Sequence, residues 1–157
     1  MKNTSIKVKD IMTVEPFIAK PTTTIQDAAR HMKAIDCGVI PIGDSGEVVG
    51  IITDRDIAMR VVAEGKDPSK IHVDEVMTKK VYSCDEEDKI EDAAKKMREH
   101  NVVRLVVTKG GKVTGIVNAA ELLHNRDDIL RSDKMLRDIS VCSSRKSYKR
   151  SAGGGCA

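Results

Sequence analysis

The residues most able to do chemistry in this sequence lie close together in the run 50–57, GIITDRDI. This run ends an apolar segment with a hydroxyl, a cation and a carboxylate at Thr53, Arg55 and Asp56. Where a strand ends and a helix begins, free backbone N–H groups and the helix dipole attract an anion. Asp56 could accept hydrogen bonds from the two hydroxyls of a ribose while Arg55 supplies positive charge. The pattern therefore predicts a site for a sugar and its phosphate.

The same residues also suit a purely structural role. Thr53 is a favourable N-cap and Asp56, three residues later, is placed to complete a capping box. Such caps stabilise a helix start by roughly 0.5–2 kcal/mol without any ligand. On spacing alone, the structural role is the better supported of the two.

Other reactive side chains form no recognisable catalytic or metal site. His31 and His100 have no Ser, Cys or carboxylate placed to complete a proton relay. The four cysteines show no Cys-x-x-Cys spacing, and the four histidines are not at metal-ligand intervals. The acidic run 85–88 suits the start of a helix. We expect no catalytic residue, no metal ligand, no cofactor and no enzyme activity.

Composition argues against a nucleic-acid partner. The formal net charge is +3, but the segment 143–157 is basic and holds no acid, so the rest of the chain is close to neutral. Aromatic residues make up only 2%, too few to stack bases. An adaptor acting through the basic segment would show steep salt dependence and would fail without it. With no secretory signal and no apolar run of about 18 residues, we expect a soluble, cytoplasmic protein without membrane contact.

The chain repeats itself after 65 residues. Identical residues at this offset include Val8, Met12, Thr13, Ile25, Asp27, Ala28, Ala29, Met32, Gly46, Val48, Gly50 and Ile51, which match Val73, Met77, Thr78, Ile90, Asp92, Ala93, Ala94, Met97, Gly111, Val113, Gly115 and Ile116. A repeat of this length is an α/β unit that must bury its apolar face against its copy. The cleft between the copies is the first place to look for a site.

Each copy predicts the order strand, helix, strand, strand, helix. A short helical signal comes first and is expected to lead into the fold rather than form its centre. Thr23-x-x-Gln26 and Asp88-x-x-Glu91 predict capping boxes before the first helices. The predicted elements are 8–12, 16–19, 25–35, 39–42, 48–52 and 54–64 in one copy, and 73–77, 81–84, 90–97, 102–107, 113–117 and 119 onward in the other.

These elements divide the chain into two repeats and a C-terminal region. We predict repeat 1 over 6–64, a linker over 65–71 and repeat 2 over 72–125. Gly65 would cap the last helix of repeat 1. A helical extension is predicted over 126–142 and a basic, disordered tail over 143–157.

The ordered series of motifs resembles a tandem pair of CBS domains, also called a Bateman module, over roughly residues 6–125. It is most similar to small stand-alone bacterial proteins that consist of little beyond one such pair. The resemblance implies a disc-like pseudo-dimer whose two clefts bind adenosyl ligands such as AMP, ADP, ATP, S-adenosylmethionine or NAD. It also implies a homodimer, since the family commonly pairs discs through helices.

The resemblance assigns roles to residues of the first repeat. It places the phosphate-side hydroxyl at Thr53 and the ribose-binding carboxylate at Asp56. Adenine would lie between the backbone near Ile18 and the strand at Ile40 and Pro41.

The second copy departs from the family pattern. Asn118 replaces the Thr, Glu121 replaces the Asp, and Val106 stands where the family usually has Pro. Ala120 offers no charge where repeat 1 has an Arg, although Arg104 occupies a place where an Arg often faces phosphate. The first cleft is therefore expected to bind more tightly.

Together these observations predict a non-catalytic regulatory module that senses an adenosyl ligand and passes its bound state to a protein partner. The alternative is a ligand-independent interaction module that acts through dimerisation or the basic tail. An open cleft with Asp56 pointing inward and unpaired would favour the first.

Overall fold

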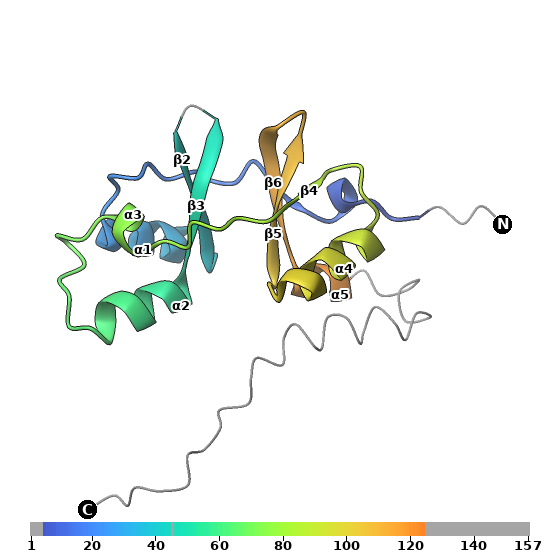
Figure 1. The fold of residues 1–157 in the computed structure, drawn as a ribbon. Coiled ribbons are helices and arrows are strands. Elements are labelled where there is room, and N and C mark those ends of the chain that lie inside the picture. Colours follow the sequence, from blue (N-terminus) through green and yellow to red (C-terminus); the bar gives the residue numbers. More distant parts are fainter. Residues whose placement is uncertain (1–4, 45, 125–157) are drawn as a thin grey trace, which may run out of the picture.

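A computed structural model describes residues 5–44 and 46–124, which form two α/β repeats side by side (Figure 1). The helical extension and the tail predicted for 126–142 and 143–157 lie outside the described residues. None of the described helices is both long and apolar enough to cross a membrane.

Repeat 1 is a hairpin covered by helices. Strands β2 (Val39–Asp44) and β3 (Glu47–Thr53) pair antiparallel, and α1 (Ile25–Ala34) packs its apolar residues beneath them. Helix α2 (Asp54–Ile57) starts directly after β3 and continues as the π-helical turn η2 (Ala58–Val62). Ala28, completely buried, allows α1 to approach the sheet closely.

Repeat 2 has the same order with a larger sheet. Helix α4 (Ile90–His100) leads to the hairpin of β5 (Arg104–Lys109) and β6 (Lys112–Asn118), followed by α5 (Ala119–His124). Strand β4 (Ser83–Asp85) pairs parallel with β5. The pattern-based prediction of a helix and a hairpin in each repeat is confirmed.

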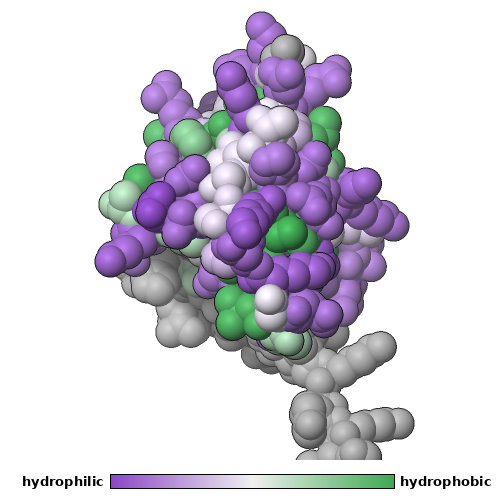
Figure 2. Space-filling view, turned by 90° about the vertical axis from the view of Figure 1, so that its left-hand side faces the viewer, coloured by the Kyte–Doolittle hydropathy of each residue, from purple (hydrophilic) through white to green (hydrophobic). Residues whose placement is uncertain are grey.

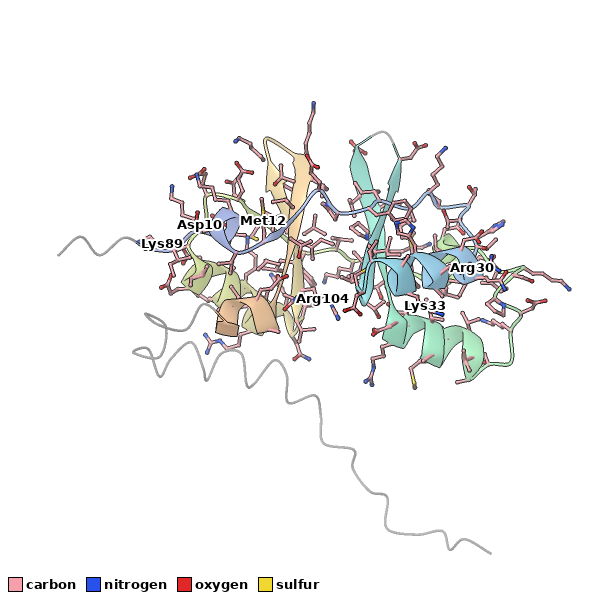
Figure 3. The ribbon with its side chains drawn as sticks, turned by 180° about the vertical axis from the view of Figure 1, so that it is seen from behind. Asp10, Met12, Arg30, Lys33, Lys89 and Arg104 are labelled. Atoms are coloured by element: carbon pink, nitrogen blue, oxygen red, sulfur yellow. The ribbon has the colours of Figure 1, made fainter. Side chains whose placement is uncertain are left out.

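The opening segments of the two repeats are exchanged. The segment with η1 (Val8–Asp10) and β1 (Thr13–Val14) packs on repeat 2, where Thr13 pairs with Ile116 of β6. Reciprocally, α3 (Val73–Val76) packs on repeat 1. Figure 3 shows this exchange from behind: Asp10 and Met12 lie at the same end of the molecule as Lys89.

The anchors of this exchange are core residues. Val8 is completely buried in the core of repeat 2, and Val73 is completely buried in the core of repeat 1. The expectation that these segments only lead into the fold is therefore wrong. It followed from local spacing, which does not show that each segment completes the other repeat's core.

Two glycines make room for the crossing segments. A Cβ atom on Gly50 would lie 2.3 Å from Met77 Sδ, and one on Gly115 would lie 2.6 Å from Met12 Sδ and 2.8 Å from the Thr13 carbonyl oxygen. A side chain at either position would collide with the segment above it. The repeated Met-Thr and Gly pairs are thus two halves of one packing contact.

The predicted capping boxes before α1 and α4 are wrong by one residue. Thr24 caps α1, its hydroxyl accepting from the Asp27 N–H at 3.1 Å. Helix α4 has Lys89 at its N-cap with no side-chain cap, and Asp88 accepts instead from the Asp85 N–H at 3.0 Å. Ser, Thr and Asp also favour turns, so they mark a helix start only approximately.

The outer end of repeat 1 is mostly hydrophilic, with apolar side chains in separate spots (Figure 2). Met59 and Val62, on η2, are 56% and 69% exposed. Gly65, at φ +64°, follows this helical region as predicted, in the conformation that glycine adopts without strain.

Candidate ligand-binding cavity between the repeats

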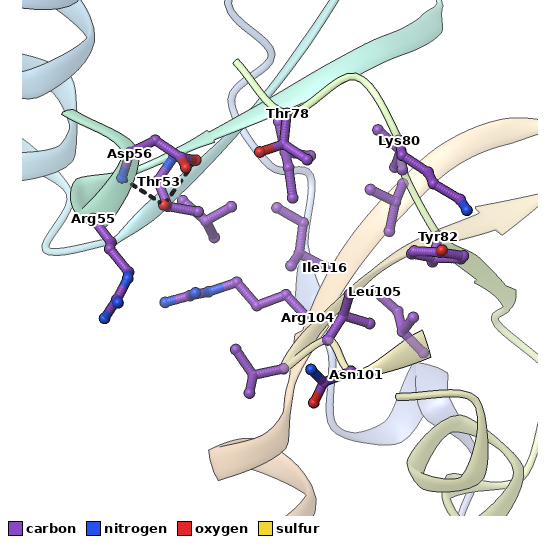
Figure 4. A pocket seen from close by; sticks show the side chains of 16 residues that line it. Thr53, Arg55, Asp56, Thr78, Lys80, Tyr82, Asn101, Arg104, Leu105 and Ile116 are labelled. Carbon is purple, nitrogen blue, oxygen red and sulfur yellow. Dashed lines mark hydrogen bonds between the residues drawn. The ribbon is translucent and has the colours of Figure 1, made fainter. Parts of the chain in front are cut away.

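A cavity of about 260 Å³ lies between the repeats (Figure 4). Both repeats supply its walls, which combine apolar strand residues with a few polar and charged side chains. The lining residues are Val39, Ile51, Thr53, Arg55 and Asp56 from repeat 1, and Thr78, Lys80, Val81, Tyr82, Asn101, Val102, Val103, Arg104, Leu105, Val106 and Ile116 from the second half of the chain.

One wall carries the start of α2, where Thr53 and Asp56 cap each other. The Thr53 N–H and hydroxyl donate to Asp56 Oδ2 at 3.0 and 2.9 Å, and the Asp56 N–H donates to the Thr53 hydroxyl at 3.1 Å. Arg60 pairs with Asp56 Oδ1 at 3.4 Å. Asp56 therefore lines the cavity but is not unpaired, and the structural role inferred from spacing is present.

The amides at this helix start are occupied. The Asp54 N–H donates to the Gly38 carbonyl at 3.1 Å, and the Arg55 N–H donates to Asp54 Oδ1 at 2.8 Å. With the Thr53 and Asp56 amides used by the capping box, none of the four is open to an anion. The prediction that backbone N–H groups here form an anion site is wrong for this structure.

Positive charge at the cavity comes from side chains instead. Arg55 extends from α2 and Arg104 reaches from β5 toward the same side (Figure 4). Lys80 lies elsewhere in the lining, its Nζ 5.3 Å from the centre of the Tyr82 ring. Tyr82 raises the pKa of Lys80 by hydrogen bonding to it, so Lys80 is charged at neutral pH.

The cavity opens into a second space of about 530 Å³. Thr53, Arg55, Val103 and Arg104 line both spaces. The two arginines therefore stand where the enclosed part of the cleft meets its open part.

The strand wall comes from a different place than predicted. Ile18, Ile40 and Pro41 do not line this cavity; Ile40 is 1% exposed, in the core of repeat 1. Leu105 and Val106, 65 residues after Ile40 and Pro41, line it instead. The prediction took both walls from one repeat, whereas this cavity takes one wall from each.

The predicted residues of the second cleft form a matching helix start at α5. The Asn118 N–H donates to Glu121 Oε2 at 2.8 Å, and the Glu121 N–H donates to Asn118 Oδ1 at 2.9 Å. The Thr13 hydroxyl also donates to Glu121 Oε1 at 2.9 Å. Neither residue lines the cavity that holds Thr53 and Asp56.

The family model for the CBS domain matches residues 8–63 and 73–128. The chain belongs to the CBS domain family. Its tandem CBS repeats, predicted from the motifs, are confirmed by this match and by the fold.

Relatives of this CBS pair are of similar size. CBS domain-containing protein YhcV of Bacillus subtilis is 36% identical over 133 residues, which cover 85% of this chain and 94% of YhcV. Hypoxic response protein 1 of Mycobacterium tuberculosis is 32% identical over 115 residues, covering 73% of this chain and 80% of that protein. The CBS domain pair of protein MJ0100, solved with methylthioadenosine and S-adenosyl-L-methionine, has a TM-score of 0.69 and 30% identity, covering 77% and 95% of the two chains.

Several cavity residues of the CBS pair were not predicted. Lys80 and Tyr82 precede β4 in a polar stretch, and Asn101 follows α4 with φ +53°. No motif marks them, but the offset of 65 residues would have paired Lys80 with Glu15 and Tyr82 with Phe17.

One group of potential metal ligands was also missed. Ligand atoms of His72, Asp74 and Glu75 lie within 4.8 Å of one another at the start of α3. The sequence search compared histidines and cysteines and did not consider a histidine beside two carboxylates. The Glu75 carboxylate already accepts the His72 N–H at 2.9 Å.

Proposed function

We propose that this CBS pair binds an adenosyl ligand in the cavity between its repeats and serves as a regulatory module. The observation that carries the proposal is the placement of Asp56 in a cavity whose opposite wall is apolar strand. The structure of the MJ0100 pair with two adenosyl compounds supports the ligand class. Ile51, Leu105 and Ile116 offer flat apolar surface of the kind that holds an adenine ring.

Asp56 is suited to hold the ribose. A carboxylate has about four acceptor positions. The capping box and Arg60 use three of them, which leaves Oδ1 able to accept a hydroxyl. The side chain of Asp56 is 15% exposed, so a bond formed there is largely shielded from water.

Regulation would follow from the position of the ligand between the repeats. A ligand that touches Asp56 on one repeat and Leu105 on the other can bind one relative placement of the repeats better than another. It shifts the equilibrium by that difference in affinity, and a partner protein would respond to the favoured shape.

The described side chains favour a regulatory role over catalysis. Among the lining residues no Ser, Cys or His accompanies Asp56. Burial raises the pKa of Cys84 to about 11, so this thiol stays protonated at neutral pH and is a poor nucleophile.

Calorimetry and thermal shift with AMP, ADP, ATP, S-adenosylmethionine and NAD test the proposal. A ligand at 100 times its dissociation constant should add roughly 2.7 kcal/mol of stability. No heat and no thermal shift for the whole panel at millimolar concentration would contradict it.

A ligand-independent interaction module is the second candidate. It is favoured by the internal pairing of Asp56 with Thr53 and Arg60. Under both candidates we propose a homodimer, because Met59 and Val62 expose apolar surface on one helical turn. Light scattering at micromolar concentration should report about twice the chain mass of 17.2 kDa, and a monomer would contradict the assembly.

A further inference from the structure

We propose that the cavity selects adenosyl ligands that carry two or more phosphate groups, held by Arg55 and Arg104, one arginine from each repeat. The inference rests on the proposed function and narrows its ligand class. It concerns the charge of the ligand, which the resemblance to the family leaves open.

The first step is that the phosphates must be held by side chains. The amides of residues 53–56 are all hydrogen-bonded within the protein. The Thr53 hydroxyl donates its proton to Asp56. A ligand phosphate at this helix start therefore finds no free backbone donor, and the nearest donors are the guanidinium groups.

The second step is that both guanidinium groups lack a counter-ion. Neither Arg55 nor Arg104 forms an ion pair with any described residue, whereas Asp56 is paired with Arg60. Asp54 also lies at this rim: a Cβ on Gly38 would lie 2.9 Å from Asp54 Oδ2 and 3.4 Å from an Arg104 guanidinium nitrogen. Two like charges at one opening repel each other, and an anion between them would offset that repulsion.

The third step concerns space. The enclosed cavity of about 260 Å³ and the outer space of about 530 Å³ meet at Arg55 and Arg104. A nucleoside in the inner part would direct its 5′ substituent between the arginines into the outer part. A chain of phosphates has room there, and each guanidinium can donate two parallel hydrogen bonds to one of them.

Calorimetry of the full chain with adenosine, AMP, ADP, ATP and S-adenosylmethionine tests the inference. Each arginine contact with phosphate should add roughly tenfold, so ATP should bind about 100-fold more tightly than adenosine. Higher salt should weaken ATP binding and leave adenosine binding unchanged.

The outcomes separate this inference from the proposed function. Adenosine or S-adenosylmethionine binding as tightly as ATP would overturn the phosphate selection alone. No binding by any compound would overturn the proposed function. Inorganic triphosphate binding as tightly as ATP would support the arginine pair and contradict adenosyl recognition.

Arginine variants locate the effect. Arg104→Ala and Arg55→Ala should each weaken ATP binding roughly tenfold and leave adenosine binding unchanged. Arg30→Ala is the matched control, since Arg30 is exposed on α1 and pairs with Asp27, away from the cavity. Circular dichroism would verify folding, and Arg104→Lys should restore part of the affinity. Unchanged ATP affinity in Arg104→Ala would overturn the inference.

Discussion

At the start of α2, Thr53 and Asp56 cap each other, and 65 residues later Asn118 and Glu121 do the same at the start of α5. The carboxylates differ in reach. Glu121 is one methylene longer and accepts directly from Thr13 at 2.9 Å. Asp56 falls short of Thr78, and Arg60 bridges the two, 3.4 Å from Asp56 and 3.3 Å from Thr78.

The charges around these helix starts differ more than their hydrogen bonds. At the 65-residue offset, the cavity residue Arg55 corresponds to Ala120, Arg104 to Val39 and Lys80 to Glu15. The same framework thus has three cations on one side, and two neutral residues and an acid at the equivalent positions. Capping and packing require the framework in both repeats, whereas anion recognition needs the charges in only one.

The strongest test of this comparison exchanges the two carboxylates. Asp56→Ala should weaken adenosyl binding by at least tenfold, because a hydrogen bond to a charged group contributes about 1.5–3 kcal/mol. Glu121→Ala should leave the tight phase of a calorimetric titration intact. The reverse pattern would show that the functional cleft is the one at α5.

The glycines beneath the exchanged segments should also respond unequally. Overpacking costs about 1–3 kcal/mol, and Gly115→Ala should cost more than Gly50→Ala, because its Cβ meets the backbone of Thr13 at 2.8 Å. Chemical denaturation would measure both free energies of unfolding.

A second substitution separates side-chain from backbone contact. Met77→Ala should remove most of the penalty of Gly50→Ala, whose closest contact is Met77 Sδ at 2.3 Å. Met12→Ala should remove less of the penalty of Gly115→Ala. Equal rescue in the two repeats would contradict the backbone contact as the cause.

The first helices of the repeats differ in their caps. Thr24→Ala removes the hydroxyl that accepts the Asp27 N–H and should cost about 1 kcal/mol in thermal unfolding. Lys89→Ala at the equivalent position removes no cap and should cost close to nothing. A similar loss in both variants would mean that the Thr24 bond contributes little.

The smallest expected effect is the pH dependence of one exchanged segment. Lys7 and Lys9 both pair with Glu87, and their hydrogen bonds lower the pKa of Glu87 from 4.5 to about 2. Because this pKa is lowered on folding, the stabilisation is present above pH 4.5 and is lost as pH falls toward 2.

The effect should be small since the pair is exposed. Glu87→Gln should remove this part of the pH dependence of unfolding. In repeat 1 the equivalent of Glu87 is Thr22, and Thr22→Ala is the matched control that should leave the pH profile unchanged. A profile unaltered by Glu87→Gln would contradict the assignment.

Local patterns predicted local structure well. The alternation and spacing around Val39 to Thr53 identified the β2–β3 hairpin and the start of α2, because both depend on neighbouring residues. Pairing between distant segments could not be predicted in this way. The contact of Thr13 with Ile116 depends on how two complete repeats come together.

The site shows the same division. Thr53, Arg55 and Asp56 were identified because the motif is contiguous, and all three line the cavity. Arg104 was assigned to the second cleft, yet it lines the first. Its long side chain crosses from β5, and only the relative placement of the repeats decides which cleft it reaches.

The exchange of opening segments has a consequence for synthesis of the chain. Lys7 and Glu87 are 80 residues apart, and Val8 packs into a core that also includes Ile90 and Leu122. Folding slows as contacting residues become more distant in sequence. During translation the opening segment leaves the ribosome first, but the core that it completes is made last. Residues 7–14 must therefore wait, with Val8 exposed, until nearly all of both repeats has been synthesised.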